Sequence, residues 1–168
     1  MITAATWRII SVVLSVIVLS LASVYDVRTM RLPNAVTLPG IPIGLLLCAV
    51  SCDVKETLIR SIAVAALLAV YFTGLLAGGD AKLLMTVAAL NGALAMILSL
   101  LVSNVIIILY RYLRDRDGTE ASLFYGWTLL TRPDRMEIVK KREGKKVPFA
   151  IYLAIGYLIV ETLLLLAK

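Results

Sequence analysis

The stretch SIAVAALLAVYFTGLLAGGD, residues 61–80, runs through nineteen uncharged residues and ends at Asp80. A second stretch of the same kind has seventeen uncharged residues, from Ile9 to Tyr25, and ends at Asp26. Hydrophobic residues make up 61% of the 168-residue chain and its mean hydropathy is +0.95, too apolar for an ordinary water-soluble domain. Because a bilayer core about 30 Å thick needs roughly 20 apolar residues per helix, the sequence predicts an all-α integral membrane protein.

The uncharged runs predict how many helices cross the membrane. The prolines Pro33, Pro39 and Pro42 indicate a short or kinked start to the second span. The run from Leu83 to Tyr110 would be roughly 42 Å long as one helix, too long for one comfortable span and short for two. A turn at Asn91-Gly92 would divide it and give six transmembrane helices, whereas an unbroken helix would give five. The other expected spans are 6–25, the segment between 31 and 53, 61–77, and a last one that starts at 147.

The distribution of basic residues favours six spans. In that arrangement thirteen of the seventeen Lys and Arg residues share one face of the membrane, ten of them in the polar segment from 111 to 146. Cytoplasmic loops carry the excess of Lys and Arg. We therefore predict a multi-pass plasma-membrane protein with Asp26 and Asp80 at its cytoplasmic side. We also predict that residues 1–168 form one membrane-embedded domain, with a cytoplasmic loop at about 111–146.

Other features exclude or suggest further classes of function. The formal net charge of +6 does not indicate nucleic-acid binding, because membrane proteins are often basic for reasons of topology. The chain has no His, and no cluster of metal ligands is visible, so no metal or cofactor is predicted. Glu161 lies inside the last apolar run, where an acid is either functional or reaches the interface from near a helix end.

The two aspartates lie in the local sequences YDVRTMRLPN, residues 25–34, and AGGDAKL, residues 77–83. These resemble the two motifs of the prepilin peptidases, the membrane aspartic proteases of the GxGD class. In that family an aspartate that closes the first span precedes an Arg and an apolar-Pro-Asn element, and a second aspartate lies in Gly-x-Gly-Asp-x-Lys-Leu. The resemblance extends to Val147-Pro148-Phe149 and so covers most of the chain. The matching residues are Asp26, Arg28, Leu32, Pro33 and Asn34 in the first motif, and Gly79, Asp80, Lys82 and Leu83 in the second.

The resemblance implies an aspartic endopeptidase that works without a cofactor. Asp26 and Asp80 would be catalytic: one carboxylate accepts a proton from water, and the other stays protonated and polarises the scissile carbonyl. The sequence does not decide which is which. The implied substrates are prepilin-like proteins with a short basic leader before an apolar helix held in the lipid bilayer. The residues expected to support the motifs are Arg28, Pro33, Asn34, Gly78, Gly79 and Lys82.

Two departures from the family pattern qualify this interpretation. Ala77 replaces the first glycine of the second motif, a change that is mild unless the position requires a left-handed backbone. The chain also lacks the Cys-rich insert of the larger bacterial members. The chain resembles the compact form of the family, found with tight-adherence and archaeal-type pili. This resemblance gives no reason to expect amino-terminal methylation.

Three other hypotheses remain open from the sequence. Asp26 and Asp80 could be helix-end charges that Arg28 and Lys82 neutralise. Tyr25-Asp26 and the glycine-rich motif also fit an intramembrane protease of the presenilin type. A small transporter could use Asp26, Asp80 or Glu161 as an ion or proton site. The oligomeric state is not predicted.

Overall fold

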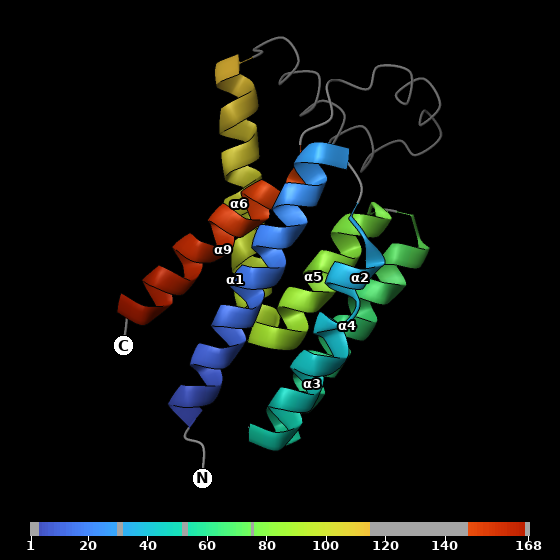
Figure 1. Cartoon of the computed structure of the whole chain (residues 1–168), viewed down its shortest axis with the longest axis vertical. Coiled ribbons are helices and arrows are strands. Elements are labelled where there is room, and N and C mark those ends of the chain that lie inside the picture. Colours follow the sequence, from blue (N-terminus) through green and yellow to red (C-terminus); the bar gives the residue numbers. More distant parts are fainter. Residues whose placement is uncertain (1–3, 30–31, 52–53, 75, 115–147, 167–168) are drawn as a thin grey trace. The chain divides into compact units, whose positions relative to one another are not determined.

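The computed structural model describes residues 4–29, 32–51, 54–74, 76–114 and 148–166. All regular structure in these ranges is helical, which confirms the predicted all-α class (Figure 1). The helices are α1 (Ala4–Thr29), α2 (Asn34–Thr37), α3 (Gly40–Ser51), α4 (Val54–Phe72), α5 (Gly78–Asn91), α6 (Ala93–Arg114) and α9 (Phe149–Leu166).

The chain divides into two compact units, residues 1–103 with 148–168, and residues 104–147. The predicted polar loop at about 111–146 begins within the last turn of α6, and the rest of it lies outside the described residues. Both aspartates and the described parts of both motifs belong to the first unit.

Helix α5 is the buried centre of the first unit, in contact with α1, α3, α4 and α9. Its side chains from Leu83 to Leu90 are all buried. Because these side chains are buried on every side of the helix, α5 is enclosed by the neighbouring helices. Leu19 and Ala22 of α1, and Leu153 and Tyr157 of α9, belong to the same core cluster as the α5 side chains.

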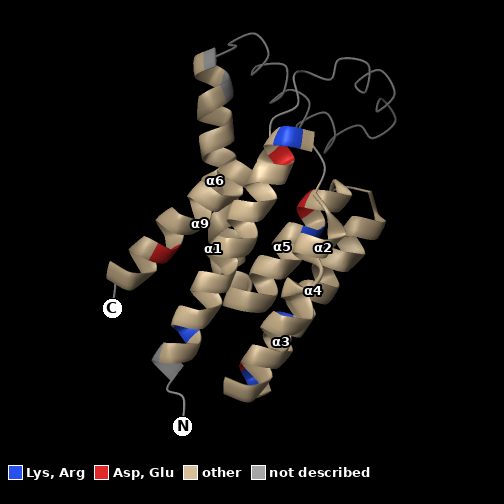
Figure 2. Cartoon of the chain, in the orientation of Figure 1, with Lys and Arg blue, Asp and Glu red and all other residues tan. Residues whose placement is uncertain are grey.

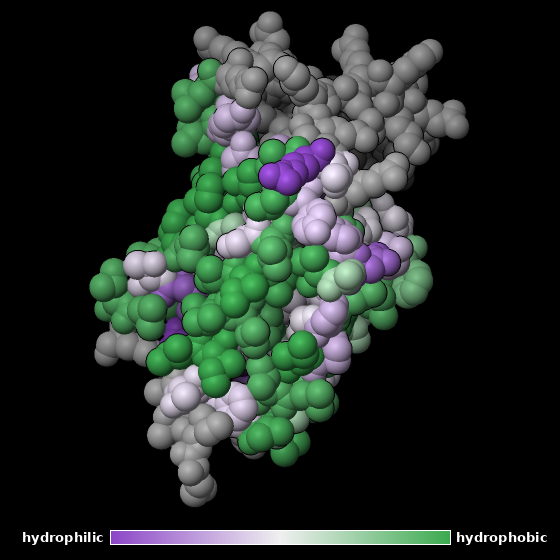
Figure 3. All heavy atoms as spheres, viewed as in Figure 1, coloured by the Kyte–Doolittle hydropathy of each residue, from purple (hydrophilic) through white to green (hydrophobic). Residues whose placement is uncertain are grey.

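Apolar side chains cover much of the face that Figure 3 shows, and many large apolar residues are exposed. On α1 the exposed residues Ile9, Val13, Ile17 and Leu21 recur every four positions and form a stripe along one face. Lys, Arg, Asp and Glu residues instead lie near the helix ends (Figure 2). Both features are typical of helices that lie in a bilayer.

Within the described residues, four segments are long and apolar enough to cross a membrane: Thr6–Thr29, Asn34–Ser51, Ala93–Tyr110 and Phe149–Leu166. The predicted count of six transmembrane helices is therefore not confirmed. Helix α4 carries Lys55, Glu56 and Arg60 in its first two turns, and α5 has only 14 residues. A 14-residue helix is about 21 Å long, shorter than the hydrocarbon core.

The predicted break at Asn91-Gly92 is confirmed. Helix α5 ends at Asn91, Gly92 has a φ of 91°, and α6 begins at Ala93. Glycine adopts this backbone conformation without the steric cost that a Cβ would bring. The segment that contains Pro33, Pro39 and Pro42 is also interrupted as predicted, since a turn at Leu38 and Pro39 separates α2 from α3.

Candidate active site

Asp26 lies in the last two turns of α1 and is buried, with 8% of its surface exposed. Its Oδ2 accepts a hydrogen bond of 3.0 Å from the backbone N–H of Ala150. Ala150 is in the first turn of α9, where backbone N–H groups have no partner within the helix. The carboxylate of Asp26 thus fills a position at a helix N-terminus that favours negative charge.

Asp80 lies in the first turn of α5, outside the four membrane-length segments, and is partly buried. Burial, and in second place the charge of Asp26, raise the pKa of the Asp80 carboxyl from its ordinary value of 3.8 to about 6. An effect of Asp26 on this pKa requires the two carboxyls to be near each other. Helices α1 and α5 are in contact, so the two predicted aspartates lie on neighbouring helices.

Lys82 and Asn34 connect the two sequence motifs. The Lys82 Nζ donates a hydrogen bond of 2.7 Å to the Asn34 Oδ1, across 48 positions of sequence. One turn further along α5, the Thr86 hydroxyl donates to the backbone carbonyl of Thr37 at 2.7 Å. These two bonds hold α2 against α5 close to Asp80.

The two glycines before Asp80 allow other side chains to approach. A Cβ added to Gly79 would lie 3.1 Å from the Leu32 Cδ1, and one added to Gly78 would lie 3.2 Å from the Tyr71 Cε2. The sequence predicted that these glycines support the site. In the structure, the space that they leave is used by side chains of the protein itself.

The remaining motif positions have ordinary backbone conformations. Ala77 precedes α5 with φ −61° and ψ 140°, so an alanine is not strained there and the change from glycine is mild, as expected. Pro33 precedes α2 with φ −70°, which the proline ring favours. Arg28 is exposed at the end of α1, two residues after Asp26, and so projects from a different face of the helix.

Sequence reasoning missed two contributors to the site, the Ala150 N–H and the Tyr71 ring. A signal existed for the first, because Val147-Pro148-Phe149 forms part of the family resemblance and directly precedes Ala150. Nothing in the sequence indicated Tyr71, which comes from the last turn of α4.

Glu161 does not belong to this site. It lies eleven residues after Ala150 on α9, a separation of about 16 Å along the helix axis. Its side chain is buried and forms an ion pair with Arg8, with 3.5 Å between the Glu161 Oε2 and the Arg8 Nη2. No group of three or more His, Cys, Asp or Glu side chains that could hold a metal ion occurs in the described part of the chain.

A double-mutant cycle tests the link between the motifs. Because the Lys82–Asn34 bond is charge-assisted but exposed, we expect a coupling energy of about 1 kcal/mol between Lys82→Met and Asn34→Ala. The free energies of unfolding of the wild type, the two single variants and the double variant give this quantity. Strictly additive effects would show that the bond does not hold α2 to α5.

An all-helical membrane protein that brings two acids together at helix ends has the architecture expected of a membrane peptidase. The chain belongs to the type IV leader peptidase family, whose sequence model matches residues 13–111, more than half of the chain. The matched segment contains both aspartates and ends before α9. Comparisons with curated proteins and with solved structures found no match.

Family membership confirms the resemblance that the two motifs indicate. Members of this family are peptidases that remove leaders from prepilin-like proteins, and the apolar helices agree with a place in the membrane.

Proposed function

We propose that the protein is an aspartic endopeptidase in which Asp26 and Asp80 activate a water molecule. It removes the short basic leader of prepilin-like substrates at the cytoplasmic face of the plasma membrane. The observation that carries this proposal is that Asp26 and Asp80, 54 positions apart in the sequence, lie in the two family motifs on helices α1 and α5, which are in contact.

The raised pKa of Asp80 supports a division of roles between the acids. A carboxyl with a pKa of about 6 holds its proton more readily than an ordinary aspartate, so Asp80 is the group that donates to the scissile carbonyl. Asp26 is the base, and the Ala150 N–H fixes the position of its Oδ2.

The reaction then proceeds in two balanced steps. In the first, water attacks the carbonyl carbon, Asp26 accepts a proton from that water, and Asp80 gives its proton to the carbonyl oxygen. In the second, the tetrahedral diol collapses: Asp26 protonates the leaving nitrogen, the C–N bond breaks, and Asp80 recovers its proton from the diol oxygen. Both acids return to their starting states, and one water molecule has been consumed.

The cytoplasmic orientation rests on the distribution of basic residues. The break at Gly92 supports the six-span arrangement, in which thirteen of seventeen Lys and Arg residues share a face with Asp26 and Asp80. On that face the site can reach the junction where a basic leader meets an apolar substrate helix.

Co-expression with candidate prepilins tests the proposal, with leader removal read from the mass of the pilin. We expect full removal by the wild type and none by Asp26→Asn. Thr29→Val is the matched control, because Thr29 lies exposed one turn further along α1 and valine has nearly the same shape. Leader removal by a folded Asp26→Asn variant would rule out the two-acid mechanism, and cleavage within the substrate helix would favour a presenilin-like enzyme.

A further inference from the structure

A cavity of about 410 Å³ lies at the ends of the helices opposite the two aspartates. Arg8 lines it from α1, and Asp26 lies eighteen residues later on that helix, about 27 Å away along the axis. Asn91, the last residue of α5, also lines the cavity, whereas Asp80 lies in the first turn of the same helix. The cavity is therefore separate from the proposed peptidase site, and its size is in the range of small-molecule sites.

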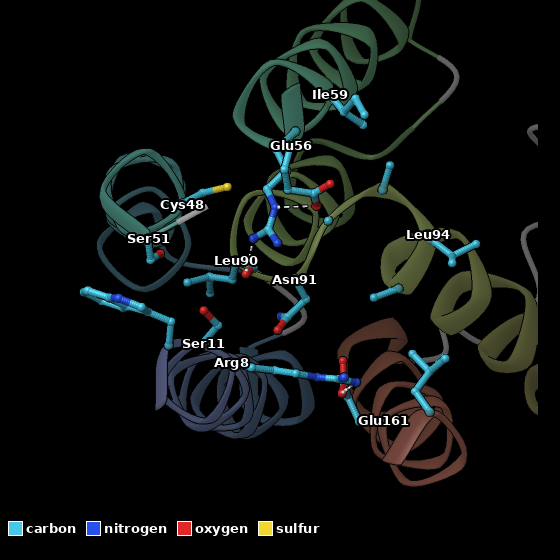
Figure 4. A pocket seen from close by; sticks show the side chains of 16 residues that line it. Arg8, Ser11, Cys48, Ser51, Glu56, Ile59, Leu90, Asn91, Leu94 and Glu161 are labelled. Carbon is cyan, nitrogen blue, oxygen red and sulfur yellow. Dashed lines mark hydrogen bonds and ion pairs between the residues drawn. The ribbon is translucent and has the colours of Figure 1, made fainter. Parts of the chain in front are cut away.

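The cavity wall carries two positive and two negative side chains. Arg60 is already engaged: its Nε donates to Glu56 at 3.1 Å, and its Nη1 donates to the carbonyls of Ala89 and Leu90 at the end of α5. Arg8 and Glu161 form the second pair, and both side chains point into the cavity (Figure 4).

Glu161 is the unusual member of this set. Only 6% of the surface of Glu161 is exposed, and its Oε2 is buried without a hydrogen bond. The contact with Arg8 at 3.5 Å is an ion pair but does not supply that bond. A buried carboxylate oxygen is costly when no donor reaches it, so a ligand that brings a donor there would be stabilised.

Apolar side chains form the rest of the wall. Ile59 of α4, Leu94 of α6 and Leu164 of α9 line the cavity, and Ile59 and Leu94 are exposed on the bundle surface. A ligand that fits this site has one polar end, which carries a positive and a negative group. The rest of the ligand is apolar and lies against the apolar surface of the helices. A membrane lipid has this construction.

We infer that the cavity binds the headgroup of a zwitterionic aminophospholipid, with its primary ammonium on Glu161 and its phosphate on Arg8. The ammonium brings N–H donors to the Glu161 Oε2, and Arg8, whose side chain is 32% exposed, has donors left for a phosphate. The paired charges of the wall sum to zero, which matches a ligand without net charge. A choline headgroup lacks the N–H donor, and a glycerol headgroup lacks the positive charge.

Lipid titrations on the purified full-length protein in detergent test this inference without any peptidase assay. Dioleoyl phosphatidylethanolamine, phosphatidylcholine and phosphatidylglycerol would be compared by native mass spectrometry. We expect the ethanolamine lipid to bind about tenfold more tightly than either of the others, because neither of them brings a charged N–H donor to the Glu161 carboxylate. Equal affinities of the wild type for the three lipids would overturn the inference, whatever any variant does.

The variant Glu161→Gln keeps the shape of the side chain and removes its charge, and we expect it to lose the preference for ethanolamine. Thr162→Val is the matched control, because Thr162 is the next residue of α9 and is exposed. It should keep the full preference. A folded Glu161→Gln protein that still prefers the ethanolamine lipid would also overturn the assignment.

Discussion

Replacing Asp80 with Asn is expected to abolish leader removal and, at the same time, to stabilise the folded protein above about pH 6. The loss of activity should be on the order of 10³-fold, since an amide can neither donate the proton to the carbonyl nor recover it. The gain in stability arises because the substitution removes a partly buried charge that lies near Asp26.

The pH dependence of this stability effect follows from the raised pKa of Asp80. Below about pH 3.8 the carboxyl is protonated in both the folded and the unfolded chain, so wild type and Asp80→Asn should be equally stable. Between that pH and about 6, the unfolded chain loses the proton more readily, and the wild type becomes progressively less stable than the variant. Above about pH 6 the difference is constant, on the order of 1 kcal/mol after screening by water at this partly exposed position.

Unfolding of both proteins in mixed micelles between pH 4 and pH 8 measures this difference, and a purified-enzyme assay on a prepilin measures activity. The wild-type kcat/KM should also fall as the pH rises above about 6, because Asp80 then loses the proton that it must donate. A stability difference that stays flat across this range would contradict the raised pKa. Appreciable activity in folded Asp80→Asn would contradict the role of Asp80 as proton donor.

The parts of this site that could be predicted from the sequence are those encoded by neighbouring residues. Asp26 and Asp80 stand out because each follows a long uncharged run, and their neighbours complete two family motifs. The break at Gly92 could also be predicted, since a glycine after Asn91 permits the positive φ that ends α5. Ala77 replaces a family glycine, and its extended backbone shows that this position does not require the left-handed conformation that favours glycine.

Contacts between distant residues could not be predicted in this way. The bond from the Ala150 N–H to Asp26 joins positions 124 apart, and a backbone donor has no residue type that would reveal it. The ion pair of Arg8 with Glu161 depends on how α1 and α9 are turned toward each other. The number of membrane spans could not be predicted from the uncharged runs alone, because α4 begins with charged residues and α5 has only 14 residues.

One packing signal in the sequence went unnoticed, the spacing of Gly40 and Gly44 in GIPIG, residues 40–44. Small residues four apart let two membrane helices approach closely. Both glycines are buried on the face of α3 that contacts α5, and a Cβ on Gly40 would collide with the Thr86 side chain. This contact holds the helix that carries Asp80 and Lys82.

Gly44→Leu is therefore expected to destabilise the folded protein by about 3 kcal/mol or more, and to lower leader removal along with it. A Cβ at Gly44 would lie 2.7 Å from the carbonyl carbon of Ala89 and 2.8 Å from the nitrogen of Leu90. Both are backbone atoms, so no change of side-chain rotamer can relieve the collision and α3 must move away from α5. Unfolding in mixed micelles and the melting temperature in detergent measure the loss.

Ala49→Leu is the matched control, because Ala49 lies on an exposed face of the same helix and leucine there adds apolar atoms where nothing in the bundle opposes them. We expect its stability to stay within about 0.5 kcal/mol of the wild type. Gly44→Ala should fall between the two, since a single methyl group already lies inside the backbone contact. If Gly44→Leu were as stable as Ala49→Leu, α3 and α5 could not pack as closely as these distances require, and the support that α3 gives to the helix of Asp80 would have to come from elsewhere.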